Sequence, residues 1–129
     1  GKALTALKLD PLTFQPQQVA LSDDQNKYLS KIAELMQQRP ELRVRFCGVG
    51  YTSVPPENEG DNSSQKTKDE TLQKEKIRAL NRAKQLANDT KNALINQHGI
   101  SADRLFSCQP GTEQATAEST ADARVELML

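Results

Sequence analysis

The segment Leu42–Cys47 constrains the fold most, because apolar residues alternate in it with two arginines and a cysteine. Successive side chains of a strand point to opposite faces of a sheet. One face of this strand is therefore apolar, and the other carries Arg43, Arg45 and Cys47. This pattern is typical of a sheet that is covered on one side only. The chain has 129 residues, enough for a single two-layer core, so helices from the same domain must cover the apolar face.

Two helices with apolar stripes are predicted to form this cover. The first begins after Ser22, which forms a capping-box pattern with Gln25, and it ends before Pro40. The second is predicted over residues 72–97, with Gly99 as its left-handed terminator. In both segments apolar residues recur three or four positions apart, as they do on the buried side of an amphipathic helix.

Three further strands complete the predicted sheet, over residues 7–14, 104–108 and 124–129. The sequence therefore predicts an α+β fold for one domain, residues 1–129. Its architecture is a two-layer sandwich with two main helices packed on one face of a mixed four-stranded sheet, in the order β-α-β-α-β-β.

Three segments between these elements are expected to be irregular. Residues 48–52 contain two glycines and are expected to form a flexible turn. Residues 53–70 are almost devoid of apolar side chains and predict a long, polar and disordered loop. Residues 112–122 are rich in Thr, Ala, Glu and Ser and are expected to form a surface loop.

Charge and composition argue against several functions. Seventeen basic residues balance seventeen acidic ones, whereas a nucleic-acid or membrane-surface binder normally has a basic excess. No apolar run approaches the ~20 residues that a membrane span requires. With one histidine and two cysteines, the chain cannot supply a Cys/His zinc site, and no motif for another cofactor is present. No catalytic triad is visible either, and the acidic residues lie mostly in predicted loops or on exposed helix faces, so we expect no enzyme.

The two cysteines, Cys47 and Cys108, both fall in short predicted strands. They are either buried free thiols or the partners of one disulfide. Pairing is geometrically possible and would be completed in an oxidising compartment.

Several segments resemble the OmpA-like C-terminal domain. They are Phe14 before a capped helix, Pro40–Arg45 leading into a glycine, Gly99–Ile100 near Arg104, and Arg124–Leu127. Members of that family that bind peptidoglycan carry a Gly-His-Thr-Asp turn and a helical Leu-Ser-x-x-Arg-Ala motif. Their Asp and Arg hold the two charged ends of a diaminopimelate residue, since a zwitterion needs a carboxylate and a guanidinium close together.

This chain departs from the family's ligand motif. Tyr51 stands at the carboxylate position of the turn. Counting back along the helix places Leu86 at the arginine position, whereas a literal motif match takes Arg82. Asn58 is the candidate for the family's asparagine. The usual peptidoglycan-binding pair is therefore not kept.

A closer resemblance is to the C-terminal end of AsmA-like envelope proteins of unknown function from Gram-negative bacteria. It lies in the segments Arg45–Val49, Arg104–Pro110 and Ala123–Leu127. The resemblance implies a periplasmic domain of a larger, inner-membrane-anchored protein involved in envelope maintenance or lipid traffic between membranes. It also implies a Cys47–Cys108 disulfide, because the periplasm is oxidising.

Two functional hypotheses follow. The first is a non-enzymatic docking or stabilising module at the C-terminus of such a protein, with an envelope protein or a cell-wall component as its partner. The second is a variant peptidoglycan-binding domain. In it Arg82 supplies the cation, Tyr51 a hydroxyl or stacking face, and an acidic residue of the long loop the anion, the candidates being Glu57, Glu59 and Asp61.

Overall fold

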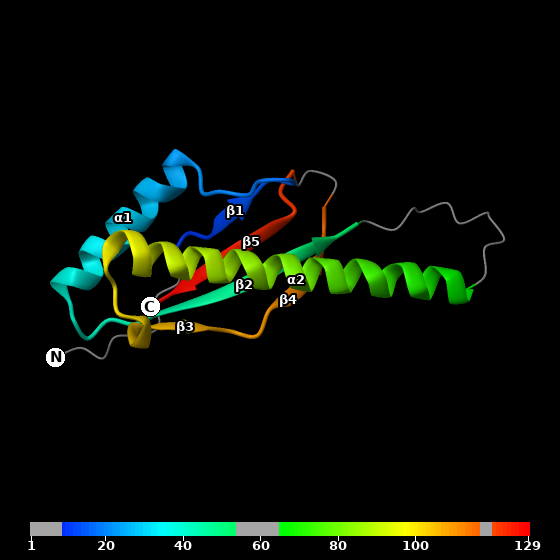
Figure 1. Cartoon of the computed structure of the whole chain (residues 1–129). Helices are drawn as coiled ribbons and strands as arrows, with labels where there is room; N and C mark the ends of the chain where they lie inside the picture. The colour runs from blue at the N-terminus through cyan, green and yellow to red at the C-terminus, as the bar shows by residue number, and fades with distance from the viewer. Residues whose placement is uncertain (1–8, 54–64, 117–119) are drawn as a thin grey trace.

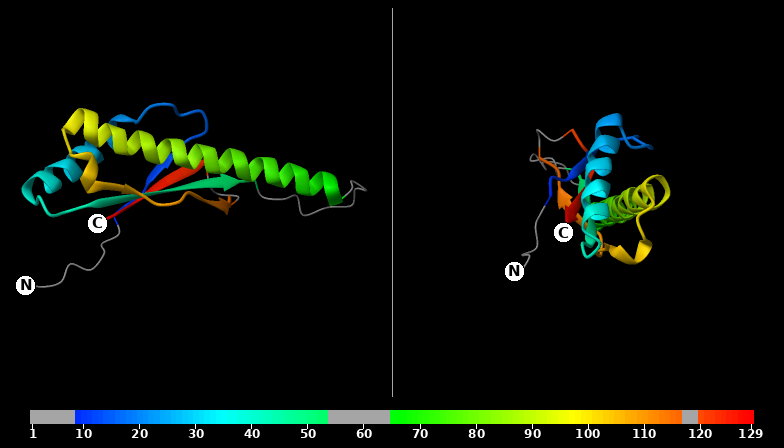
Figure 2. Two further views of the ribbon diagram at one scale, coloured as in Figure 1. Left: turned by 60° about the horizontal axis from the view of Figure 1, so that its bottom comes forward. Right: turned by 90° about the vertical axis from the view of Figure 1, so that its left-hand side faces the viewer.

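A computed structural model describes residues 9–53, 65–116 and 120–129, with the backbone alone for 65–69. The elements in chain order are β1 (Leu12–Phe14), α1 (Asp23–Gln38), β2 (Val44–Thr52), α2 (Gln65–His98), a short 3₁₀ turn (Ala102–Arg104), β3 (Leu105–Ser107), β4 (Gly111–Gln114) and β5 (Ala123–Met128). Both helices lie on the same side of the strands (Figures 1 and 2). The predicted α+β architecture, two helices on one face of a mixed sheet, is confirmed.

The sheet is ordered β1-β5-β2, and β3 and β4 share the far edge of β2. β1 and β2 are antiparallel to β5, whereas β3 and β4 are parallel to β2. β3 lies beside Val44–Phe46 and β4 beside Val49–Thr52. The sheet is thus four strands wide, as predicted, but its last position is filled by two short strands placed end to end.

The predicted turn at residues 48–52 is wrong, because β2 continues through Thr52. The glycines do not end the strand but let α2 approach it closely. A Cβ atom on Gly48 would lie 2.8 Å from the carbonyl carbon of Ala83, and one on Gly50 would lie 2.6 Å from that of Ala79. Local sequence suggested flexibility, whereas the reason for these glycines is contact with a distant helix.

The predicted surface loop at 112–122 is also wrong at its start, because residues 111–114 form β4. These residues carry little apolar patterning, and only the free edge of the extended β2 makes them a strand. α2 begins at Gln65, so the last six residues of the expected loop 53–70 are helical. Residues 54–64 lie outside the described part of the chain.

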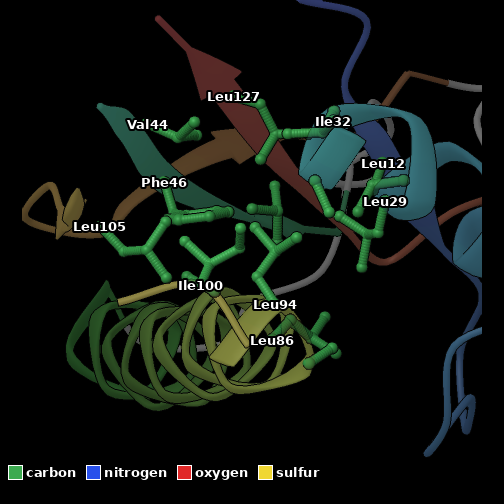
Figure 3. Packing of buried hydrophobic residues seen from close by; sticks show 14 of the residues in the cluster. Leu12, Leu29, Ile32, Val44, Phe46, Leu86, Leu94, Ile100, Leu105 and Leu127 are labelled. Carbon is green, nitrogen blue, oxygen red and sulfur yellow. The ribbon is translucent and has the colours of Figure 1, made fainter. Parts of the chain in front are cut away.

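The core lies between the helices and the apolar side of the sheet (Figure 3). Its largest fully buried side chains come from both helices and three strands: Phe14, Phe46, Leu29, Met36, Leu94, Leu127, Val44 and Val125. The stripe predicted on α2 is buried from Ala83 onward, but Ile77 is 52% exposed. Ala79 lies against Gly50 of β2, and a side chain two residues earlier points to nearly the opposite side of the helix, so Ile77 faces away from the sheet.

Local signals set both ends of α1 and the C-terminal end of α2 as predicted. The Ser22 hydroxyl accepts a hydrogen bond from the Gln25 amide (3.2 Å), and the Gln25 side chain accepts one from the Ser22 amide (2.9 Å). Gly99 follows α2 with a φ of 68°. At the end of α1, the Arg104 guanidinium donates to the carbonyls of Met36 and Arg39, both at 2.8 Å. Arg104, which is far along the chain, thus supplies hydrogen-bond donors for carbonyls at the end of α1 that have no partner within the helix.

Candidate binding surfaces

Arg82 on α2, the predicted ligand-binding cation, is hydrogen-bonded to other residues of the same chain. Its Nη2 donates to the carbonyls of Gln15 (3.1 Å) and Gln18 (2.9 Å), in the segment between β1 and α1. Its Nε donates to Asp122 Oδ2 at 3.2 Å, just before β5. The side chain is only 20% exposed. Arg82 therefore ties α2 to the two segments that flank β1 and β5.

Asp122 links three elements at this end of the sheet. Its backbone amide donates to the Phe14 carbonyl, and its own carbonyl accepts from the Tyr51 amide, each at 2.9 Å. Its side-chain Oδ2 takes the Arg82 hydrogen bond, while Oδ1 is buried and has no hydrogen-bond partner among the described residues. The Arg82–Asp122 ion pair thus connects α2 to the start of β5, and one oxygen of its carboxylate has no hydrogen-bond partner among the described residues.

Tyr51 lies on the opposite side of the sheet. Gly50 faces α2, and alternation along β2 turns the next side chain away from the helices. We call that side the open face. There the Tyr51 hydroxyl accepts a hydrogen bond from Arg124 Nη1 at 2.7 Å, and the Arg124 guanidinium lies 5.5 Å from the centre of the tyrosine ring.

Arg124 is the centre of an ion cluster on the open face. It donates two parallel hydrogen bonds to Glu113, at 2.7 and 2.8 Å, and one to Glu126 at 2.9 Å. The hydrogen bonds to Glu113, and secondarily those to Tyr51 and Glu126, raise the pKa of Arg124 above its ordinary value, although partial burial opposes them. This bidentate geometry fixes β4 to β5 across the intervening β2. The sequence analysis missed this role of Arg124.

The predicted ligand set is not brought together by the fold. Tyr51 and Arg82 lie on opposite sides of the sheet, and both already have partners within the chain. Asn58 lies outside the described residues, as do the loop acids proposed as the anion, Glu57, Glu59 and Asp61. The roles of these residues in binding stay predictions.

Cys47 and Cys108 form a disulfide in the structure, with their Cα atoms 4.8 Å apart. Cys47 lies on the open side of β2, and Cys108 follows β3, where its amide donates to the Phe46 carbonyl at 2.9 Å. Of the two alternatives that the residues alone left open, the structure adopts the disulfide. It joins β2 to the chain that passes from β3 to β4.

A hollow of about 410 Å³ lies on the open face at the end of the sheet away from Arg124. We call it the open-face hollow, and its lining residues are Arg43, Val44, Arg45, Phe106, Met128 and Leu129. The Arg43 guanidinium lies 5.8 Å from the centre of the Phe106 ring, and Phe106 is 43% exposed.

If the last strand pairs beside residues 42–47, alternation alone would let Glu126 meet Arg43 or Arg45 across the strands. In the observed register Glu126 lies opposite Cys47, and its carboxylate pairs with Arg124 at 2.9 Å. Only the register, which depends on how β5 returns to the sheet, decides which charges meet.

Across the described ranges, no group of three or more His, Cys, Asp or Glu side chains is arranged to hold a metal ion. In the same ranges, no helix combines the length and the apolar character needed to cross a membrane.

Comparison with known proteins yields no matching family model and no matching curated protein. Solved structures of Helicobacter pylori MotB are similar. The periplasmic domain of residues 78–256 is 26% identical, with 95% of this chain and 73% of that chain covered and a TM-score of 0.48. The form with residues 90–256 is 24% identical, with 95% and 71% covered and a TM-score of 0.49.

The C-terminal domain of the same MotB, residues 125–256, is 24% identical, with 92% of this chain and 82% of that chain covered and a TM-score of 0.47. Because all three TM-scores lie below 0.5, these superpositions by themselves assign neither a family nor a ligand to this chain.

Proposed function

We propose that this chain is a non-enzymatic, OmpA-like docking module of the periplasm, at the C-terminus of a larger AsmA-like envelope protein, and that its partner is an envelope protein. The observation that carries the proposal is the state of Arg82. The arginine that matches the family's ligand motif holds the carbonyls of Gln15 and Gln18 and the carboxylate of Asp122. These contacts use three of the five N–H donors of the guanidinium, so Arg82 stabilises the fold and is held in place by the chain itself.

Two further observations support the proposal. The disulfide between Cys47 and Cys108 suits an oxidising compartment such as the periplasm. The open face leaves Phe106 and two arginines accessible beside a hollow, and residues of these types are enriched at protein interfaces.

Site-specific photo-crosslinking in cells tests this function. A photoreactive amino acid replaces Phe106 on the open face or, as the matched control, Gln85 on the exposed side of α2. We expect a discrete protein adduct from position 106 and none from position 85. Equal adducts from both positions, or none from either, would contradict a protein-docking role.

The variant peptidoglycan-binding function is the second candidate, and one observation favours it. Asp122 Oδ1 is buried without a hydrogen-bond partner among the described residues, next to the Arg82 guanidinium. An ammonium group that reached this carboxylate would satisfy it. The second function would then use the Arg82–Asp122 pair in place of the family's Asp and Arg.

Co-sedimentation of the oxidised chain with purified sacculi decides between the two functions. The docking proposal expects the chain to stay in the supernatant. Sedimentation that Asp122→Asn abolishes, while circular dichroism shows the variant to be folded, would support the peptidoglycan-binding function and refute the docking one. Arg82→Ala is the companion variant, interpretable only with the same check of folding.

A further inference from the structure

The open-face hollow combines apolar walls with two cationic side chains. Phe106 on β3 and the last residues of the β5 segment, Met128 and Leu129, form the apolar sides. Arg45 on β2 and Arg43, which directly precedes β2, line the hollow as well, on the side of the strand away from the helices. Both arginines are exposed, and Arg43 lies over the Phe106 ring. A cation stacked on an aromatic ring keeps its edge donors available to a ligand.

The positive charge in this hollow is local. The chain as a whole has a net charge of zero. Of the three ion pairs found between described residues, none includes Arg43 or Arg45, whereas Arg124 at the other end of the open face takes two carboxylates. The open face is therefore polarised, with two arginines at one end and, at the other, one arginine that is outnumbered by two glutamates.

Asp103 is an acidic residue near enough to Arg43 for their charges to interact. Its carboxylate accepts a hydrogen bond from the Ser101 hydroxyl, which is the main reason that its pKa is lowered, and Arg43 contributes only a smaller electrostatic part. Asp103 is fully exposed in the short turn before β3 and does not line the hollow. It therefore leaves the two guanidiniums available there.

We propose that the open-face hollow binds an acidic segment of the partner protein, with carboxylates on Arg43 and Arg45 and an apolar side chain against Phe106 and Met128. The inference rests on the docking function proposed above and names its surface and the chemistry of its partner. A guanidinium matches a carboxylate with two parallel hydrogen bonds, so two arginines flanking an apolar patch select an acidic peptide that also carries an apolar residue.

The size and charge of the site favour a peptide over a membrane surface. A volume of about 410 Å³ lies within the usual range of ligand pockets. Binding to an anionic membrane generally requires a cluster of about four to eight basic residues, and this hollow has two. Two further hollows of similar size have no arginine and no aromatic residue in their lining.

A binding assay with defined peptides tests the inference on the 129-residue chain. The probe is fluorescein-labelled Glu-Asp-Phe-Leu-Glu, and its amide counterpart is Gln-Asn-Phe-Leu-Gln. Both are measured by fluorescence anisotropy at about 0.15 M salt, where the Debye length is about 8 Å. We expect the acidic probe to bind, and the double substitution Arg43→Gln with Arg45→Gln to weaken it by about tenfold or more, because each lost charged hydrogen bond exceeds a factor of ten. Phe106→Ala should also weaken binding.

The matched control removes the same charge from the helix side, by Lys31→Gln with Arg78→Gln. This control should leave the affinity within about twofold, because Lys31 on α1 and Arg78 on α2 lie in the helix layer, on the other side of the sheet from the hollow (Figure 2), and salt screens their charges. Equal binding of the two peptides, an equal loss in both double variants, or no binding of the acidic probe at about 1 mM would overturn the inference.

A separate experiment measures binding of the chain to vesicles of phosphatidylethanolamine and phosphatidylglycerol. Arg43- and Arg45-dependent binding to these vesicles, without peptide binding, would assign the hollow to lipid and refute the peptide inference. The crosslinking experiment distinguishes this failure from failure of the docking function. A protein adduct at position 106 without acidic-peptide binding would leave docking intact and remove only the inferred chemistry.

Discussion

Replacing Gly50 by alanine tests whether the packing of α2 on β2 depends on the missing side chain. The new Cβ would lie 2.6 Å from the carbonyl carbon and 2.9 Å from the Cα of Ala79, and still closer to its oxygen. Carbon atoms pack optimally at about 3.5–4.0 Å. The obstructing atoms are backbone, so no rotamer change can relieve the clash and α2 must move outward by roughly 1 Å.

The expected cost follows from this geometry. Overpacking of a well-packed core costs typically 1–3 kcal/mol, and a clash with backbone belongs at the upper end, about 3 kcal/mol. With an unfolding entropy of about 2.1 cal/mol/K per residue, 129 residues give about 0.27 kcal/mol/K. The melting temperature should therefore fall by about 11 °C. Strand propensity alone predicts the opposite sign, since alanine is favoured over glycine by about 0.5–1 kcal/mol.

Gly111→Ala is the matched control, because an added Cβ there would meet nothing within 4 Å. Urea and thermal unfolding followed by circular dichroism at the helix band measure both variants, since the chain has no tryptophan. We expect Gly50→Ala to be clearly destabilised and Gly111→Ala to match or slightly exceed the wild type. If Gly50→Ala is as stable as Gly111→Ala, the close approach of α2 to β2 does not exist as described.

Three further predictions concern the disulfide, the internal arginine Arg82 and the partly buried Tyr28. Cys47→Ser with Cys108→Ser should lose about 4 kcal/mol in the chain-entropy model for partners 61 residues apart, seen as a lower urea midpoint that matches the reduced wild type. Arg82→Met should lower the free energy of unfolding by about 2–3 kcal/mol, because the Gln18 carbonyl and the Asp122 carboxylate lose their hydrogen-bond donor. Arg78→Met, on the exposed helix surface, should change the free energy of unfolding by less than about 0.5 kcal/mol in the same assay. Burial, and secondarily the charge of Asp10, raises the pKa of Tyr28 above 10, so stability should fall as pH rises past 10, and Tyr28→Phe should flatten that dependence in alkaline unfolding curves.

Elements whose signals are local could be predicted from the sequence. The ends of α1 follow from the Ser22–Gln25 capping box and from Pro40, all within one turn of the helix termini. The alternation at residues 42–47 correctly predicted which side of β2 packs under the helices. These features depend on hydrogen bonds between residues close in sequence and on the directions of successive side chains, so they can be predicted from the local sequence.

The two glycines and the two internal arginines acquire their roles only in the tertiary structure. Gly48 and Gly50 suggest a turn when read locally, but α2 lies against them and keeps them in the strand. Arg82 and Arg104 look like ordinary solvated cations in the sequence, yet they reach carbonyls more than sixty residues away. No local pattern encodes a partner at that separation.

The sequence by itself determined the fold class, the order of the main elements, the apolar side of the sheet and the availability of two cysteines for pairing. Only the tertiary structure decided that Tyr51 and Arg82 lie on opposite sides of the sheet, and that Arg43, Arg45 and Phe106 surround one hollow. The physical reason is that secondary structure follows from short-range periodicity, whereas a binding surface depends on strand register and on which distant chain segments pack together.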